Sequence, residues 1–520
     1  MLKINALWIT CLFLPSLSFA EKESAVVRKI DELLKARWKE EKIRPARKAN
    51  SADFLRRLYL DIAGRIPSIG ITQEFLYSRD PAKKAKFIDR IVKTPEYAEH
   101  WANVWADILI GPAMRQPMVN RRALIAWLDE QFRKNTPFDK FVRELLTAEG
   151  YSDENGATNY FMKFKMPAEA AASVSRIFLG VQIQCAQCHN HPYEKWTQDD
   201  FNGFQAFFSK THPRREKRAG KDMRPRFILT EFKFTPRRMM ERMGMKDAGN
   251  PKYLGGNKLN LGPLAKRRPV FAAWLTDKNN PYFARAVVNR YWGILTGRGI
   301  VQPMDDFGEN NPPSHPEILD LLAKDFMANG YDVRRLLRIL TSSYAYQASS
   351  RVPSSHREDP PPDELFAYQQ LKPLSAEQIV MSILEATRLR KAKNRKIASA
   401  IRSKARMVVT QFNFIFDTDG MEEVSSFEGT IPQALLMLNG PLTNDTLKPI
   451  PGTTLGEIAT SKQSVDKKLD ILFLSTLTRL PDANDRIYFK RYLRAGGYKP
   501  EAWADVQWTL LNTSEFLFVN

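Results

Sequence analysis

Apolar residues recur at three- and four-residue spacing along most of the chain, which is the pattern of helices with one buried face. One such stripe runs from Phe54 to Ile62 and another from Trp101 to Leu109. Prolines interrupt the stripes at intervals of roughly 15 to 25 residues, which indicates short helices joined by turns. We therefore expect a helical N-terminal domain over residues 21–209, with a late helix over residues 168–179.

The C-terminal half repeats this pattern and adds helix-boundary signals. Ser314 followed by Glu317 predicts a capping box, with Gly330 placed to end that helix. Asp332 predicts the cap of the next helix, and Ser375 begins a second capping box. These signals predict a second helical domain over residues 269–520.

Residues 210–268 differ from both halves, because paired basic residues alternate there with glycine and proline. We interpret this segment as a connector, with a short hairpin formed by residues 227–229 and 232–234. The predicted fold class is mainly α: two helical domains joined by a basic irregular connector with little β.

Residues 1–20 have the features of a secretory signal peptide. Lys3 precedes an apolar run, and Ser18 and Ala20 provide the small residues at which a signal peptidase cleaves. The run is shorter than the ~20 residues that span a bilayer, and no later stretch reaches that length without a charge. We expect an exported protein, periplasmic or extracellular, with no transmembrane segment after cleavage.

The chain is strongly basic, with a net charge of +21 and a pI near 9.7. Such a charge favours acidic partners. Export makes nucleic acid an unsuitable partner, so an acidic redox protein or an acidic polysaccharide remains. Since the basic residues are spread along the chain, the charge can equally serve solubility.

The most informative motif is Cys185-Ala186-Gln187-Cys188-His189. In C-x-x-C-H, two thiols bond covalently to haem while the next residue ligates its iron. The sequence has three cysteines, and the third, Cys11, lies in the predicted signal peptide. We therefore predict haem c, held by Cys185, Cys188 and the proximal ligand His189.

Two other uses of the cysteines remain open. Cys185, Cys188, His189 and His191 offer four donors that Zn accepts, although zinc sites usually draw ligands from two distant segments. Alternatively, the two thiols form a disulfide, as paired cysteines in exported proteins often do.

The sixth ligand of a haem iron would come from elsewhere in the chain. His100 lies on the tryptophan-bearing helical stripe, and Met239 and Met243 belong to a methionine cluster about 50 residues beyond His189. Each of these also suits an ordinary core position.

Aromatic and acidic residues near these motifs each suit more than one role. Tyr193, Trp196 and the phenylalanines from Phe201 to Phe208 could wall a haem edge or form core. Asp305 and Asp306 could bind a cation, but a buried ion-pair network with arginine suits them better.

The order of motifs resembles the planctomycete-type secreted proteins in which a cytochrome c-like domain of unknown function (1549) precedes a second domain of unknown function (1553). Asn190, where aspartate is more usual, and the basic connector depart from that pattern. The resemblance implies haem binding in the first domain and no established reaction. The matching segments are 54–61, 64–67, 99–101, 178–182, 185–189, 191–193, 195–200, 207–208, 280–285, 289–292, 297–301, 311–316 and 510–518.

The sequence therefore predicts an exported c-type haem protein for electron transfer or redox sensing, with a C-terminal domain that docks a partner or substrate. The alternative is a non-haem binding or scaffold protein of the cell exterior, with Zn or a disulfide at the cysteines, or a protein acting on polysaccharide. The chain has no glycine-rich phosphate loop and no G-x-S-x-G motif, so the sequence assigns it no enzymatic reaction.

Overall fold

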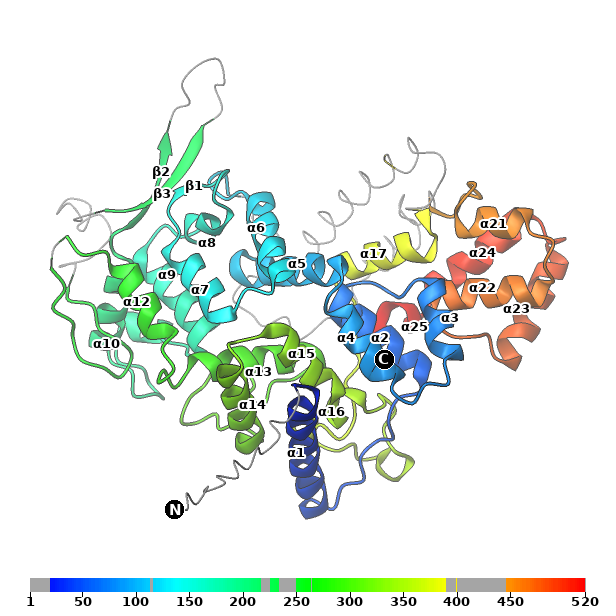
Figure 1. Ribbon diagram of the computed structural model, residues 1–520, viewed down its shortest axis with the longest axis horizontal. Helices are drawn as coiled ribbons and strands as arrows, with labels where there is room; N and C mark the ends of the chain where they lie inside the picture. Colours follow the sequence, from blue (N-terminus) through cyan, green and yellow to red (C-terminus); the bar gives the residue numbers. More distant parts are fainter. Residues whose placement is uncertain are drawn as a thin grey trace, which may run out of the picture.

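The computed structural model describes residues 19–112, 116–216, 225–232, 249–262, 264–389, 399 and 446–519. It is mainly helical, as the sequence predicts (Figure 1). The helices of the first half are α1 (Phe19–Glu40), α2 (Ser51–Ala63), α3 (Ile69–Tyr77), α4 (Lys83–Ile91), α5 (Pro95–Ile110), α6 (Arg121–Lys134), α7 (Phe138–Thr147), α8 (Asn159–Met162), α9 (Pro167–Val174) and α10 (Gln198–Gln205).

The second half is built in the same way. Its helices are α12 (Arg267–Leu275), α13 (Phe283–Thr296), α14 (Pro316–Ala328), α15 (Val333–Ser342), α16 (Tyr344–Gln347), α17 (Ala376–Ala386), α21 (Thr454–Thr460), α22 (Val465–Thr476), α23 (Ala483–Ala495), α24 (Pro500–Leu511) and α25 (Ser514–Leu517). Short helical turns are η1 (Gly156–Thr158), η2 (Ser175–Leu179), η3 (Gln184–Gln187), η4 (Ala206–Phe208), η5 (Ser354–His356) and η6 (Asp363–Leu365).

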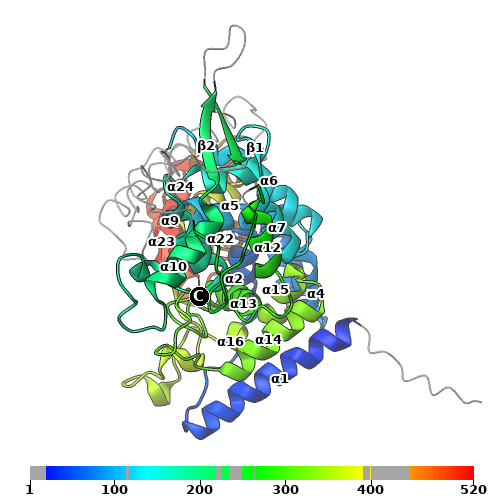
Figure 2. The same ribbon diagram turned by 90° about the vertical axis from the view of Figure 1, so that its left-hand side faces the viewer.

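The described strands form two small sheets. β2 (Thr211–Glu216) and β3 (Arg226–Glu231) pair antiparallel, and β1 (Gly150–Tyr151) pairs with the other edge of β3. β4 (Lys372–Pro373) pairs with β5 (Phe518–Val519). In the connector, β3 therefore pairs with residues 211–216, whereas the predicted partner segment 232–234 lies outside the described residues from residue 233 on. The hairpin of β2 and β3 projects from the body in both views (Figures 1 and 2).

The N-terminal helix α1 packs on helices of the second half, alongside α14 and α15 (Figure 2). Glu23 forms ion pairs with Arg338 at 2.7 Å and with Arg335 at 3.4 Å. The indole Nε1 of Trp38 donates to the carbonyl oxygen of Leu365 at 2.7 Å. The predicted signal peptide, residues 1–20, lies almost wholly outside the described residues.

Buried apolar side chains form two clusters, which divide the chain differently from the predicted domains. The first extends from Ile30 to Ala367 and includes residues of both predicted domains. The second joins residues 374–519 to Leu60 and Ile66 of the first half. The two halves of the sequence therefore share their cores.

Buried cations on α2 tie these clusters together. Arg56 donates to the carbonyl oxygens of Thr476 at 3.0 Å and Phe516 at 2.8 Å. Arg57 donates to the carbonyl oxygen of Ala348 at 2.8 Å. Both guanidinium groups are buried, and hydrogen bonds to several carbonyls are what makes such burial tolerable.

The predicted helix boundaries are mostly confirmed. Asp332 accepts a hydrogen bond from the N–H of Arg335, and Ser375 forms the capping box of α17. The predicted cap at Ser314 is wrong, because α14 begins at Pro316 with His315 as its N-cap, and the Ser314 hydroxyl donates to the carbonyl oxygen of Ile300. Within the described ranges, no helix combines the length and apolar character needed to span a bilayer.

Candidate functional site

The chain reaches the C-x-x-C-H motif through a helix that ends in a wide turn. α9 continues as the π-helical turn η2, which stops at Gly180 with a φ of +68°. The Ser175 hydroxyl donates to the carbonyl oxygen of Val181 at 2.8 Å, on the far side of that glycine. Phe178 and Leu179 are fully buried, so the exit of the chain from the helix is fixed by packing.

Cys185 lies on a short 3₁₀ turn, η3, and Cys188 is the C-cap residue that directly follows this turn. Ala186 between them is fully buried, and its N–H donates to the carbonyl oxygen of Ile183 at 3.0 Å. Both thiols are exposed and free. The turn thus presents two thiols outward from a buried anchor.

The His189 imidazole is oriented by its own backbone. Its Nδ1 lies 2.7 Å from the carbonyl oxygen of Asn190. A carbonyl oxygen only accepts hydrogen bonds, so Nδ1 carries the proton and donates. Nε2 therefore keeps its lone pair, on a side chain that is exposed.

His191 adopts the opposite tautomer. Its Nδ1 accepts hydrogen bonds from the N–H groups of Tyr193 at 3.3 Å and Glu194 at 3.0 Å. A neutral imidazole with an accepting Nδ1 carries its proton on Nε2. His189 is therefore the imidazole of this loop that offers a lone pair, and the lone pair of His191 is already used within the loop.

The start of α10 closes the loop. Gln198 donates from Nε2 to the carbonyl oxygens of Gln187 and Cys188, each at 3.2 Å. The N–H of Gln198 donates to Oδ1 of Asn190 at 3.0 Å. Since a carboxylate oxygen would accept the same bond, Asn190 performs here what the more usual aspartate would. Thr197 and Asp200 form the capping box that begins α10.

Residues 305–307 of the second half contact the segment that leads into the C-x-x-C-H loop. Phe307 donates its N–H to the carbonyl oxygen of Gly180 at 2.7 Å. Asp305 is buried, forms an ion pair with Arg176 at 3.4 Å and accepts a hydrogen bond from Gln182 at 3.3 Å. Asp305 thus pairs with an arginine, as expected, but Arg176 is partly exposed and comes from the N-terminal half.

The same segment holds the residues that follow His191. Asn310 donates to the carbonyl oxygen of Tyr193 at 2.8 Å, and the N–H of Glu309 donates to Glu194 at 3.3 Å. Lys195 pairs with Glu309 at 3.3 Å. The C-x-x-C-H loop is therefore bound on both sides of the motif by residues 305–310.

Acidic groups gather at this contact. The pKa of the Asp306 carboxyl is raised, mainly because burial disfavours its charged form and secondly because Asp305 and Glu194 add negative charge nearby. His191 acts in the opposite sense on this pKa. The loop thus lies beside a carboxyl group that retains its proton more readily than an exposed aspartate.

His100 lies away from this loop. It occupies the first half of α5, where its ring contacts the turn at Gly64: a Cβ built on that glycine would come within 2.5 Å of Nδ1. Burial, followed by the charge of Arg65, lowers the pKa of His100 to about 4. α2, which ends beside Gly64, and α10, which follows the motif, lie well apart in Figure 1. Met239 and Met243 lie outside the described residues.

The aromatic residues after the motif are mostly core. Phe201, Phe204, Phe207 and Phe208 are almost fully buried, and Phe207 packs against Phe271 of α12. Tyr193 is the exception, with 80% of its surface exposed. Among the described residues, no group of three or more histidine, cysteine, aspartate or glutamate side chains has the arrangement of a metal site.

The sequence locates the motif but not its support. Asp305 and Asp306 stand out in the sequence as an acidic pair, yet nothing local connects them to Arg176 or Gln182. The one available signal is Gly180 itself, because an isolated glycine among apolar residues often marks a close approach of another backbone.

Two protein families match the chain. Residues 29–213 match PSCyt2, described as a protein of unknown function (DUF1549), and residues 267–493 match PSD1, described likewise (DUF1553). A comparison of the chain with the curated proteins and with the solved structures found no match. Gly180 and the cysteines fall in the first matched segment and residues 305–310 in the second, so the supported loop joins the two. The chain belongs to the two-domain proteins in which a PSCyt2 domain is followed by a PSD1 domain.

Proposed function

We propose that this chain is an exported c-type haem protein that transfers electrons, with haem bound at the C-x-x-C-H loop. The observation that carries the proposal is the hydrogen bond from His189 Nδ1 to the carbonyl oxygen of Asn190. Histidines that ligate metals commonly donate their other ring N–H to such an acceptor, which fixes the tautomer and orients the ring. His189 Nε2 is thereby ready to ligate iron.

The thiols suit covalent attachment. Cys185 and Cys188 are exposed and free, one on a 3₁₀ turn and the other at its C-cap. Each thiol would add across one vinyl group, with sulfur bonding to one carbon and the thiol hydrogen to the other, so no oxidant is needed. When bound, the haem would supply a one-electron couple between ferric and ferrous iron.

The remaining residues would hold this arrangement in place. Gln198 ties the carbonyls of Gln187 and Cys188 to α10, which limits movement of the turn. Asp305 and Phe307 fix the approach to the motif from the PSD1 side. The second domain would thus support the loop, and the basic surface would favour an acidic redox partner or polysaccharide.

The proposal includes export for two reasons. The N-terminal sequence has the features of a signal peptide, and covalent haem attachment in bacteria takes place outside the cytoplasm. The competing function is a non-haem binding protein with a disulfide or Zn at the cysteines. It predicts a mature chain without a haem adduct, so one measurement separates the two.

The experiment is expression of the full chain in a bacterial host that exports proteins and matures c-type haem. We expect the mass of the purified chain to rise by one haem and its reduced spectrum to show a Soret band. Cys185→Ala or Cys188→Ala should remove stable attachment. A correctly folded mature chain with neither the added mass nor the Soret band would refute the proposal.

The role of His189 needs its own control, and the loop provides one. His189→Ala should keep the adduct but change the spectrum, because the iron loses its proximal ligand. His191→Asn should leave the spectrum unchanged, since asparagine can accept the same two backbone N–H groups. Equal spectral changes in both variants would contradict the assignment of His189.

A further inference from the structure

A column of stacked aromatic rings extends from the core to the surface beside α12. Phe207, which is fully buried, stacks on Tyr253 with centroids 5.2 Å apart and planes at 17°. Tyr253 stacks on Trp274 at 4.6 Å and 11°. Trp274, like Tyr253, is half-buried, and its indole also packs at 5.7 Å on the fully buried ring of Phe271.

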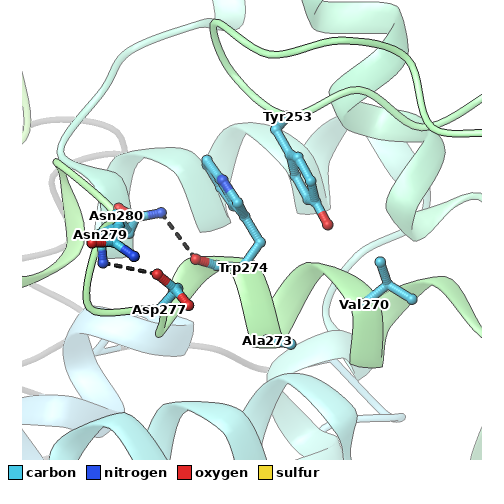
Figure 3. Close-up of a pocket in the computed structure, with 7 residues that line it drawn as sticks. All are labelled: Tyr253, Val270, Ala273, Trp274, Asp277, Asn279 and Asn280. Carbon is cyan, nitrogen blue, oxygen red and sulfur yellow. Dashed lines mark hydrogen bonds between the residues drawn. The ribbon is translucent and has the colours of Figure 1, made fainter.

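A pocket of about 490 Å³ opens at this indole (Figure 3). Val270, Ala273 and Trp274 line it from α12, and Tyr253 lines it from the segment between the two matched families. In Figure 3 the indole lies between the phenol of Tyr253 and the asparagines that follow the helix. The volume lies in the usual range for sites that bind small ligands.

The opposite rim is polar. Asp277 and Asn279 are exposed, and Asp277 accepts the N–H of Asn279 at 2.8 Å through one carboxylate oxygen. The second oxygen has no hydrogen-bond partner in the described part of the chain. Asp277 can therefore accept from ligand hydroxyls, and the Asn279 amide can both donate and accept.

The buried Asn280 connects the rim to the helices on either side of it. Its amide nitrogen donates to the carbonyl oxygen of Trp274 at 3.2 Å. Its oxygen accepts from the N–H groups of Tyr282 at 3.0 Å and Phe283 at 3.1 Å, at the start of α13. These hydrogen bonds connect the polar rim to α12, which carries Trp274, and to the start of α13.

We propose that this pocket binds a neutral hexose unit of a polysaccharide. The flat, apolar C–H face of a pyranose ring packs on an aromatic face, while its ring of hydroxyls needs acceptors and donors at the edge. Trp274 supplies the aromatic face, and Asp277 and Asn279 supply the hydrogen-bonding groups at the edge. The carboxylate of Asp277 at the rim disfavours uronic acids and sulfated sugars, because like charges repel.

This inference does not depend on haem binding, so its test needs only the folded full chain. Isothermal titration with cellohexaose and mannohexaose as neutral probes, and with a heparin hexasaccharide as an anionic probe, measures it directly. We expect at least one neutral probe to bind with a dissociation constant in the micromolar to millimolar range. Trp274→Ala should weaken that binding by roughly tenfold or more, since the stacked ring is lost.

Asp277→Ala tests the polar rim and keeps the inference testable if Trp274→Ala misfolds, because Asp277 is exposed. Asp277→Ala should weaken binding of the neutral probe, whereas Lys278→Ala, at the exposed neighbouring position, should leave that binding unchanged. Trp127→Ala is the matched aromatic control, because Trp127 is also half-buried and stacked, on Phe141 at 5.3 Å, but lies on α6.

Two results would overturn the proposal. One is the absence of binding by both neutral probes at millimolar concentration. The other is neutral-probe binding that Asp277→Ala and a folded Trp274→Ala leave unchanged. Binding of the heparin probe alone would also overturn it, since it would point to the basic surface instead of this pocket.

Discussion

The N–H of Phe307 donates to the carbonyl oxygen of Gly180 at 2.7 Å, and this bond joins the PSD1 segment to the PSCyt2 segment five residues before Cys185. Gly180 has a φ of +68°, and a Cβ built on it would come within 2.5 Å of the Phe307 ring. Both the backbone conformation and the close approach require glycine at this position. The contact sets where the C-x-x-C-H loop begins relative to the second domain.

Gly180→Ala should therefore destabilise the protein through two effects. The left-handed backbone conformation costs about 1 kcal/mol for alanine, and displacement of the partly buried Phe307 ring adds about 1–3 kcal/mol. Urea unfolding measures the sum. Gly330→Ala is the matched control, because Gly330 has a φ of +69° and a Cβ added there would meet no atom within 4 Å, so it should show the backbone cost alone. Equal losses in the two variants would mean that the Phe307 contact contributes nothing.

The exposure of the two thiols gives a prediction for the chain made without residues 1–20 in the cytoplasm. Cys185 and Cys188 should both react with iodoacetamide in the folded protein, since neither side chain is buried. Mass spectrometry should find two adducts, and one in Cys185→Ala. Removal of residues 1–20 also removes Cys11, so the count is unambiguous. Labelling that requires denaturant would contradict the exposed turn.

The local part of this fold could be predicted from the sequence. The capping signals at Asp332 and Ser375 need only residues within one turn, and both hold. The Ser314 capping box failed although its local pattern was complete, because the hydroxyl of Ser314 bonds to Ile300, which is close only in the folded chain. A polar side chain can hydrogen-bond either to a local partner or to one that only the fold brings near, and the sequence pattern reveals only the local partner.

The candidate site likewise has a part that is local in the sequence and a part that only the fold brings together. Cys185, Cys188 and His189 are local, and the sequence identified them. The bond from Gln182 to Asp305 spans 123 residues, and that between Lys372 and Asp61 spans 311. No periodicity in the chain marks either pair. The motif could be located from sequence, but the segment that supports it required the fold.

Lys372 and Asp61 form one of the buried polar contacts between the two cores. Lys372 donates to Asp61 at 2.7 Å and to the carbonyl oxygens of Ile294 at 2.9 Å and Leu295 at 2.8 Å. Asp61 is buried and also accepts from the Tyr346 hydroxyl at 3.0 Å. Lys372→Met would leave a buried carboxylate without its cation, which should cost about 3–5 kcal/mol in unfolding free energy.

Two further variants make that measurement specific. Lys93→Met removes an exposed lysine paired with Asp89 and should change stability by less than about 0.5 kcal/mol. Asp61→Asn combined with Lys372→Met should recover part of the loss, because the uncompensated charge is gone. A double variant as unstable as the sum of its single variants would show that the two side chains act independently.

The last prediction concerns pH and His315. This histidine is buried at the start of α14, and its Nε2 has no hydrogen-bond partner among the described residues. Burial, followed by the positive charge of Arg37, lowers the pKa of His315 to about 4, while Glu317 acts in the opposite sense. Between pH 6.5 and pH 4 the unfolded chain binds a proton at this position that the folded chain does not, so stability falls as pH falls through that window.

His315 should contribute about 2 kcal/mol to the loss of unfolding free energy between about pH 7.5 and pH 5. His315→Asn removes the titrating group and keeps a residue that suits an N-cap. Urea unfolding of the parent and of His315→Asn at the two pH values measures the contribution of His315 to the pH dependence. His100, whose pKa is also lowered, contributes equally to the loss of unfolding free energy in both proteins. A pH dependence as steep in His315→Asn as in the parent would show that His315 does not resist protonation in the folded protein.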